Sequence, residues 1–186
     1  GGVVQGGAVR FPLNFDSGVM RGRLNPADGQ LYLCGLRVWQ SSGAREGTFQ
    51  RVRYTGKPVT MPREMHVKKN GIELTFTSPL DAKAAGDMEN YSVDEWNYRW
   101  TKEYGSKLYS VIDPNKELGE KKQTKYSGDE LEIKSVKLGK DFKTVFLEVP
   151  ELKPAMTFRV KYNLDAADGS LVRQEIFGTI NRPVGR

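Results

Sequence analysis

The sequence predicts an all-β protein, built as a four-stranded antiparallel, blade-like sheet packed on an Ig-like β-sandwich. Three observations predict this fold class. Apolar and polar residues alternate with a period of two in many short segments, which is typical of strands with one buried face. Turn residues separate these segments at intervals of about 8–12 residues, as in β-sandwiches. No apolar pattern with the period of a helix extends beyond two turns.

The first part of the chain, residues 1–62, is expected to form the blade-like sheet. Its clearest turn is Asn25-Pro26-Ala27-Asp28-Gly29, in which proline presets φ and glycine is free to take a positive φ. The expected strands are residues 8–15, 18–24, 30–39 and 48–54, and a connector with proline at both ends follows. A single blade buries too little surface to be stable alone, so it is expected to pack on a neighbour.

The second part, residues 63–186, is expected to form the sandwich. Ile72, Leu74 and Phe76 alternate strictly with polar residues and are predicted to face its core. The expected strands are residues 64–68, 72–76, 91–100, 130–138, 144–149, 157–164 and 171–180. At about 101–127 the alternation lapses into polar, turn-rich sequence. We interpret this stretch as an inserted loop, because it is long for a structureless connection inside a compact domain.

The positive charge of the chain is concentrated in its first third. The 186 residues carry a formal net charge of +6. Residues 1–63 contain nine basic residues, eight of them arginine, against three acidic residues, and this segment alone carries +6. The remaining residues contain 20 basic and 20 acidic side chains. Such a shift in composition indicates a domain boundary and localises the basic character to the smaller sheet.

Four arginines of this segment form a candidate anion-binding set. Arg21 and Arg23 alternate on one expected strand, and Arg51 and Arg53 alternate on another. If the strands are neighbours, the guanidinium groups line one face, where they can bind carboxylate, sulfate or phosphate in a bidentate manner. The alternative, which we favour at this point, is a solvated or ion-paired face without a ligand.

An aromatic strand is the second candidate site. Trp96, Tyr98 and Trp100 alternate along the chain and would project from one face of a strand, with Tyr104 and Tyr109 nearby. Such a platform could stack on sugar rings. We favour packing of these side chains in a core or between domains, since Trp and Tyr carry much of the buried area of β proteins.

The sequence offers little for catalysis. There is one cysteine, Cys34, and one histidine, His66. Cys34 lies in an apolar strand pattern and is interpreted as a buried, inert thiol. With a single histidine there is no basis for a zinc cluster, and no convergent pair of acids is evident. We therefore expect neither an enzyme nor a bound cofactor or metal.

The second part of the chain resembles bacterial Ig-like domains of the S-layer type. The resemblance rests on residues 71–81, GIELTFTSPLD, followed by ENYSV at 89–93. It continues through TVFL at 144–147, LKP at 152–154, YNL at 162–164 and Asp168-Gly169. It covers most of residues 65–180, with the expected loop as an insertion. The resemblance implies a spacer or adhesive module.

The first part resembles the terminal blade of the propellers of glucose and sorbosone dehydrogenases, which use pyrroloquinoline quinone. The residues that carry this resemblance are NPADGQLY at 25–32 and FQRVRY at 49–54. As a whole, the chain is similar to the C-terminal region of large secreted planctomycete-type proteins that combine such propellers with c-type cytochromes. The other blades and a haem-binding Cys-x-x-Cys-His are missing here, so no cofactor residue is carried over.

These observations together predict a non-catalytic accessory or interaction module of a larger extracytoplasmic protein. The alternatives are a carbohydrate-binding module that uses the aromatic strand and a fragment of a quinoprotein sugar dehydrogenase. The expected partners are neighbouring domains of a longer parent chain and a polysaccharide, and an exposed edge strand would favour a homodimer. No membrane partner is expected. No nucleic acid is expected either, because the basic and aromatic stretches lie in different parts of the chain.

Overall fold

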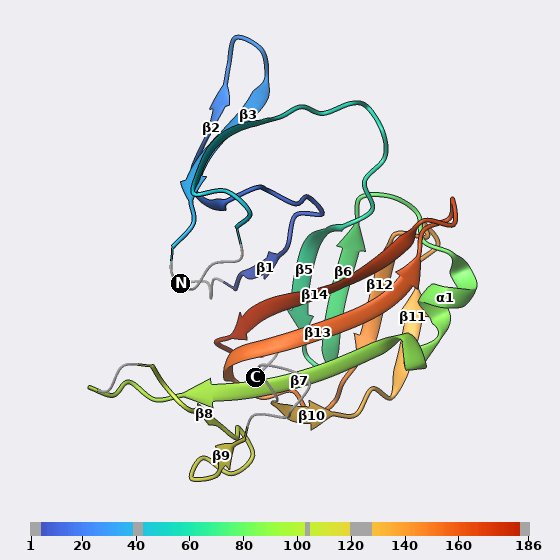
Figure 1. Cartoon of the computed structure of the whole chain (residues 1–186). Helices are drawn as coiled ribbons and strands as arrows, with labels where there is room; N and C mark the ends of the chain where they lie inside the picture. Colours follow the sequence, from blue (N-terminus) through green and yellow to red (C-terminus); the bar gives the residue numbers. More distant parts are fainter. Residues whose placement is uncertain (1–4, 39–42, 103–104, 120–127, 183–186) are drawn as a thin grey trace. The chain divides into compact units, whose positions relative to one another are not determined.

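The computed structural model describes residues 5–38, 43–102, 105–119 and 128–182 (Figure 1). Strands account for 51% of the structure and helices for 5%, and all the sheets are antiparallel. The protein is therefore all-β, as the alternating sequence pattern predicts. The chain divides into two compact units. The smaller unit is Phe11–Pro58, and the larger unit combines Gly1–Arg10 with Val59–Arg186.

The smaller unit contains a three-stranded sheet in the order β2-β3-β4. The strands are β2 (Gly18–Asn25), β3 (Gln30–Leu36) and β4 (Gly47–Val52). The turn between β2 and β3 is the predicted one. Its Gly29 has a φ of 66° and donates its N–H to the Asn25 carbonyl at 2.8 Å. This turn fixes the register of the two strands, in which Asn25 lies opposite Gln30.

The fourth strand expected in the smaller sheet belongs to the larger unit. Only β1 (Gly7–Val9) is extended within the predicted range 8–15, and it pairs with β14 (Leu171–Ile180). Val9 packs against the core of the larger unit, which provides an apolar contact for this strand. Pro12 follows closely, and a residue without an N–H does not extend a ladder. The boundary therefore falls after Arg10 as well as near Pro58.

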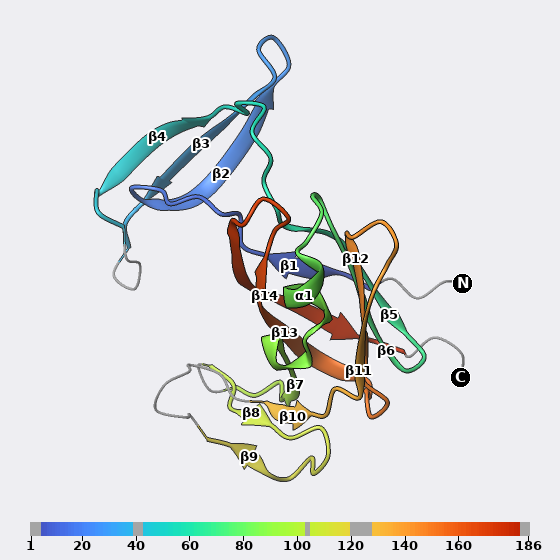
Figure 2. The same cartoon turned by 90° about the vertical axis from the view of Figure 1, so that its right-hand side faces the viewer.

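The larger unit contains two sheets that lie one over the other (Figures 1 and 2). One is a seven-stranded sheet with the order β1-β14-β13-β7-β8-β9, and its remaining strand, β10, also pairs with β7. Its members not yet introduced are β7 (Tyr91–Tyr98), β8 (Leu108–Tyr109), β9 (Glu117–Leu118), β10 (Asp129–Leu131) and β13 (Ala155–Asp165). The central pair is β13 with β14, whose register runs from Ala155 opposite Ile180 to Asp165 opposite Leu171.

The second sheet has four strands in the order β11-β12-β6-β5. They are β5 (Pro62–Lys68), β6 (Gly71–Phe76), β11 (Ser135–Leu138) and β12 (Thr144–Glu148). A short helix, α1 (Ala82–Gly86), and a 3₁₀ turn, η1 (Met88–Asn90), connect β6 to β7. The Asp81 carboxylate caps α1 by accepting the N–H of Ala84 at 2.8 Å, which is why the helix begins there.

Side chains of both sheets meet in one hydrophobic core. Ile72, Leu74 and Phe76 of β6 are almost fully buried, as their alternation predicts. They share a cluster with apolar residues of β7, β12, β13 and β14. The rings of Phe76 and Tyr162 meet edge to face across the core, with centroids 5.5 Å apart. All residues of this hydrophobic core belong to the larger unit.

The stretch expected to be an inserted loop contains secondary structure. In it β8 pairs with β7 and with β9, so that residues 97–98, 108–109 and 117–118 form a small three-stranded extension. The extension is tied to β10 by Asp129, whose carboxylate accepts the hydroxyl of Ser110 at 2.8 Å and the N–H of Val111 at 2.7 Å. Residues 103–104 and 120–127 of the expected loop lie outside the described residues.

Candidate anion-binding site

The candidate site is one face of the smaller sheet. In the sheet register Arg23 lies opposite Tyr32, and Tyr32 lies opposite Arg51. The neighbouring row places Arg21 opposite Cys34 and Cys34 opposite Phe49. Residues directly opposite each other on paired strands project from the same face, and so do residues two apart on one strand. We call this surface the arginine face, and its members are Arg21, Arg23, Tyr32, Cys34, Phe49 and Arg51.

The three arginines of the arginine face are exposed. Arg21 and Arg23 each donate one Nη1 hydrogen bond of 2.8 Å to the carbonyl oxygen of the preceding residue, Met20 and Gly22 respectively. A guanidinium has five N–H donors, so these contacts leave most of its hydrogen-bonding capacity directed to solvent or a ligand. Guanidinium groups on both edge strands, β2 and β4, can therefore bind oxyanions.

The arginine face also carries two aromatic rings and one acid. Tyr32 and Phe49 stack with their centroids 5.8 Å apart and an angle of 27° between the rings. The Tyr32 hydroxyl donates to Asp28 at 2.7 Å, and the N–H of Gln30 donates to the other oxygen of Asp28 at 3.0 Å. The Gln30 N–H and then the Tyr32 hydroxyl lower the pKa of Asp28. Asp28 is therefore a firmly ionised acceptor in the β2–β3 turn.

The other acids of the smaller unit are paired away from the arginine face. Glu46 lies 4.0 Å from Arg37, and Asp16 lies 3.5 Å from Arg45. Arg53, the fourth arginine of the predicted set, follows the last residue of β4, so the register no longer fixes its side. It lines a shallow hollow of about 460 Å³ together with Arg51 and residues 13–15. The structure thus brings three of the four predicted arginines together and places the fourth next to them.

Cys34 is exposed, so the interpretation of a buried thiol is wrong. Apolar neighbours in the sequence suggested burial. However, β3 alternates, and it is Leu33, with an exposed fraction of 8%, that takes the covered side. Cys34 consequently lies on the open face between Arg21 and Phe49.

The aromatic strand does not form an exposed platform of three rings. Trp96 is buried, and its ring contacts the ring of Phe177 edge to face and lies under the Arg159 guanidinium, 5.6 Å away. Tyr98 ends β7 half-exposed, and Trp100 lies beyond the strand with 98% of its surface exposed. A ring packed inside the protein cannot stack on a sugar, so Trp96 is a packing residue.

The remaining aromatics of that set have separate environments. Tyr109 lies on β8, where the Arg99 guanidinium covers its ring at 4.1 Å from the centroid. The same guanidinium donates to the Pro114 carbonyl at 2.6 Å, so this contact braces the extension formed by β8, β9 and the end of β7. Tyr104 lies outside the described residues.

The larger unit contains a buried ion pair on the outer side of its seven-stranded sheet. Arg159 on β13 lies opposite Asp94 on β7 and binds its carboxylate in a bidentate manner, at 2.9 and 2.6 Å. The N–H of Gly128 also donates to Asp94 at 3.0 Å, and Glu175 lies 3.6 Å from the guanidinium. Since both charges are satisfied from several sides, this pair is a structural element.

Glu95, next to Asp94, is a buried acid with an incomplete set of partners. Its side chain is fully buried, and its Oε1 has no hydrogen-bond partner within the described residues. The N–H of Lys153 approaches Oε2 at 3.5 Å. Burial raises the pKa of Glu95 to about 7, with a smaller contribution to that value from the nearby Asp129 carboxylate, which lies opposite it in the register. Sequence reasoning missed this group, because the alternation of β7 does not reveal which acid is covered.

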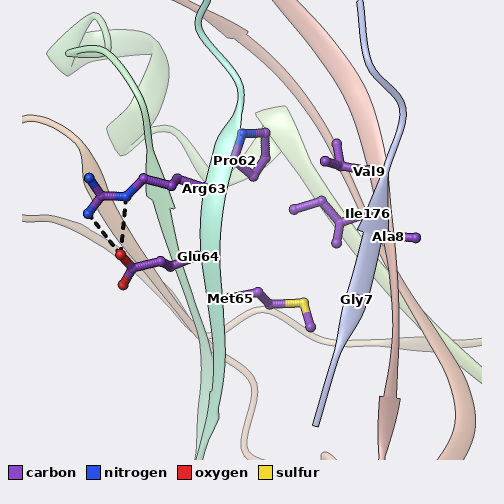
Figure 3. Close-up of a pocket in the computed structure, with 8 residues that line it drawn as sticks. All are labelled: Gly7, Ala8, Val9, Pro62, Arg63, Glu64, Met65 and Ile176. Atoms are coloured by element: carbon purple, nitrogen blue, oxygen red, sulfur yellow. Dashed lines mark hydrogen bonds and ion pairs between the residues drawn. The ribbon is translucent and has the colours of Figure 1, made fainter. Parts of the chain in front are cut away.

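A crevice of about 160 Å³ opens between β5 and the strand pair β1 and β14 (Figure 3). Its inward-facing groups are apolar, and the thioether of Met65 projects toward Gly7 and Ile176 (Figure 3). Arg63 and Glu64 line its rim, but their side chains point away from β1 and bind each other at 2.8 Å. The charged side chains beside the crevice are therefore not directed into it.

The described residues form no metal-binding cluster. His66 is exposed and lies 3.6 Å from Glu64. Among the described residues, no group of three or more His, Cys, Asp or Glu side chains is placed to hold a metal ion. Within the same ranges, no helix is long and apolar enough to cross a membrane.

Comparisons of this chain with protein-family models, with curated proteins and with solved structures found no match. The candidate site therefore rests on its own geometry. Sequence reasoning found its arginines from the alternation of β2 and β4, but missed the two rings among them. The sequence did contain a signal for the position of Tyr32, because the predicted β2–β3 turn fixes the register that places this residue between Arg23 and Arg51.

Proposed function

We propose that this chain is a non-catalytic interaction module of a larger extracytoplasmic protein, and that it binds an anionic ligand through the arginine face. The larger unit would serve as an Ig-like β-sandwich spacer. Two antiparallel sheets around one core support this assignment. The smaller sheet would be a blade-like module, one strand shorter than the sequence suggested.

The observation that carries the proposal is the alignment of three exposed arginines around two rings on one sheet face. The smaller unit has seven basic and three acidic side chains. Two of those acids pair with Arg37 and Arg45, so the positive charge that is not compensated lies on and beside the arginine face. Arginine is the side chain best suited to bind carboxylate, sulfate or phosphate groups in a bidentate manner.

The proposal is tested by the binding of anionic polymers to the whole chain in isothermal titration calorimetry. Polygalacturonate, dextran sulfate and inorganic polyphosphate are the probes, and neutral dextran is the reference. We expect binding of at least one anionic polymer that weakens as salt is added, because exposed charges are screened. The triple variant Arg21→Gln, Arg23→Gln, Arg51→Gln should bind at least about tenfold more weakly.

A matched variant controls for net charge. Lys69→Gln, Lys137→Gln, Lys140→Gln removes the same number of positive charges from exposed positions of the larger unit. It should leave the affinity within about twofold of the unmodified chain, because every group of the arginine face is unchanged in this variant. Equal losses in the two triple variants would mean that only net charge matters and that the arginine face is not a site.

No observation favours the aromatic strand as a second site, since its first ring is buried. The quinoprotein alternative and the extracytoplasmic location remain predictions. The sequence of the parent protein would test both through the presence or absence of further blades and of a secretion signal.

A further inference from the structure

The two rings of the arginine face lie between its charges. Tyr32 stands in the middle of a row, with Arg23 on one side and Arg51 on the other. Neighbouring strands are about 4.8 Å apart, so the backbones of these two arginines are separated by about 10 Å. Phe49 stacks on Tyr32 and remains 74% exposed. A ligand that spans the arginines must therefore cover a flat apolar surface between its two anionic groups.

The Asp28 carboxylate places a second requirement on a ligand of the arginine face. Its carboxylate is held beside Tyr32 by the hydrogen bond from the Tyr32 hydroxyl, and each carboxylate oxygen has capacity for further donors. A ligand with a negative charge on every repeat and no donors would be repelled at this point. A ligand with hydroxyl groups can donate to Asp28 while its anionic groups bind the arginines. The site therefore suits a hydroxyl-rich polymer of moderate charge density.

We propose that the ligand of the arginine face is an acidic polysaccharide. Its carboxylate or sulfate groups bind Arg23 and Arg51, a sugar ring covers Phe49 and Tyr32, and a hydroxyl donates to Asp28. This inference rests on the proposed function of the face as an anion-binding site. It differs from the three-ring platform expected on the aromatic strand, because the stacking surface lies in the smaller unit and the charges are part of the recognition.

Cys34 provides a native reporter for this site. It is the only cysteine of the 186 residues, it is exposed, and it lies opposite both Arg21 and Phe49. A polymer that covers the face must slow the reaction of its thiol with a small neutral reagent such as N-ethylmaleimide. The rate of alkylation, followed by mass spectrometry of the whole chain, therefore measures occupancy of the face.

The experiment compares five probes: polygalacturonate, κ-carrageenan as a sulfated polysaccharide that keeps most of its hydroxyl groups, inorganic polyphosphate, oligodeoxythymidine and neutral dextran. We expect the two acidic polysaccharides to slow alkylation of Cys34 about tenfold or more at saturation. Polyphosphate and oligodeoxythymidine should need concentrations about tenfold higher for the same protection. Neutral dextran should not protect. The two polysaccharides also distinguish carboxylate from sulfate as the bound group.

Two substitutions test the ring and the acid separately. Phe49→Ala should weaken polygalacturonate binding about tenfold and change polyphosphate binding by less than about twofold, because only the sugar uses the ring. Phe49→Tyr keeps a ring and should preserve the affinity. Asp28→Asn removes the charge that disfavours polyphosphate and the strongest acceptor for a hydroxyl. It should therefore reduce the preference for polysaccharide over polyphosphate about tenfold.

The outcomes separate the two proposals. If no anionic polymer protects Cys34, the anion-binding function is wrong, and the polysaccharide inference is wrong with it. If anionic polymers bind but polyphosphate or oligodeoxythymidine binds as tightly as the polysaccharides, the anion site stands and the polysaccharide inference is overturned. If Phe49→Ala weakens the binding of all probes equally, the polysaccharide inference is overturned as well. Selective protection by the acidic polysaccharides, lost in Phe49→Ala, supports both.

Discussion

The two units of this protein use the same residue types for opposite purposes. In the larger unit Arg159 is buried and binds Asp94 through two hydrogen bonds. In the smaller unit Arg21 and Arg23 are exposed, and each donates a hydrogen bond to the carbonyl oxygen of the residue before it. The aromatic residues differ in the same way, because Phe158 is fully buried whereas Phe49 is 74% exposed.

The difference shows which residues are available for function. A buried ion pair is costly to break because each partner leaves the other as an uncompensated charge. An exposed arginine contributes little to stability and keeps its donors for a ligand. The comparison predicts that substitutions in the larger unit change the free energy of unfolding, and that matched substitutions on the arginine face change binding alone.

The largest effect is expected for the two phenylalanines. Phe158→Ala removes a fully buried ring from the shared core and should lower the free energy of unfolding by about 4 kcal/mol. Phe49→Ala removes an exposed ring and should change it by no more than about 0.5 kcal/mol. Urea denaturation of both variants measures the contrast. If Phe158→Ala does not fold, Phe158→Leu replaces it and is compared with Phe49→Leu. Similar decreases in the free energy of unfolding for these two variants would contradict the assignment of Phe158 as a buried ring and Phe49 as an exposed one.

The second effect concerns the arginines. Asp94→Ala should destabilise the larger unit by about 3 kcal/mol, because the buried Arg159 guanidinium loses its bidentate carboxylate partner, while Glu175 is more distant. The double variant Asp94→Leu, Arg159→Met should recover part of the loss, since it leaves no buried charge. Arg23→Gln should leave the denaturation midpoint unchanged. A stable Asp94→Ala protein would show that the pair is not needed to hold β7 against β13.

The third effect is a pH dependence that belongs to the larger unit. The pKa of Glu95 is raised to about 7 by burial, above its ordinary value of 4.5. Below about pH 4.5 both the folded and the unfolded chain hold the proton. As the pH rises from there to about 7, the unfolded chain loses the proton while the folded chain keeps it, so this contribution to stability falls. Above pH 7 the loss is complete, and we expect it to reach about 3 kcal/mol.

Glu95→Gln tests this assignment because glutamine has a similar shape and no charge. The variant should be more stable than the unmodified chain at pH 8, and the difference should vanish near pH 4. The charges of Asp129 and Lys153 both act on Glu95, and Lys153 lowers its pKa, so Lys153→Gln should keep the titration and shift it to higher pH. Chemical denaturation between pH 4 and pH 8 provides the curves. Parallel curves for the glutamine variant and the unmodified chain would rule out Glu95 as the titrating group.

The sequence predicted the parts of the fold that depend on local pattern. The alternation in Ile72, Leu74 and Phe76 identified a core strand, and Asn25 to Gly29 identified a turn that the structure contains. Membership of a sheet depends on distant residues. The strand near Val9 was assigned to the wrong sheet because its partner, β14, lies more than 160 residues away in the chain, around Ile176.

The candidate site was predictable to a similar extent. Alternation placed Arg21 with Arg23 correctly, since period two holds within one strand. The burial of a single side chain was harder to predict from the sequence, because it depends on what covers each face of the strand. Trp96 and Cys34 show this in opposite directions. Trp96 was a candidate for an open platform and is buried, whereas Cys34 was expected to be buried and is exposed.

The smallest expected effect separates the two faces of the smaller sheet itself. Leu33 and Cys34 are neighbours on β3, but Leu33 is buried and Cys34 is exposed. Leu33→Ala should destabilise the smaller sheet by about 2 kcal/mol, at the low end for a buried leucine, because a single sheet can relax around the lost volume. Cys34→Ala should have no measurable effect. Amide hydrogen exchange of β3 in the whole chain reports this local stability. Faster exchange in Cys34→Ala than in Leu33→Ala would mean that the arginine face is the covered side of the sheet, and the binding site proposed there would have no open surface.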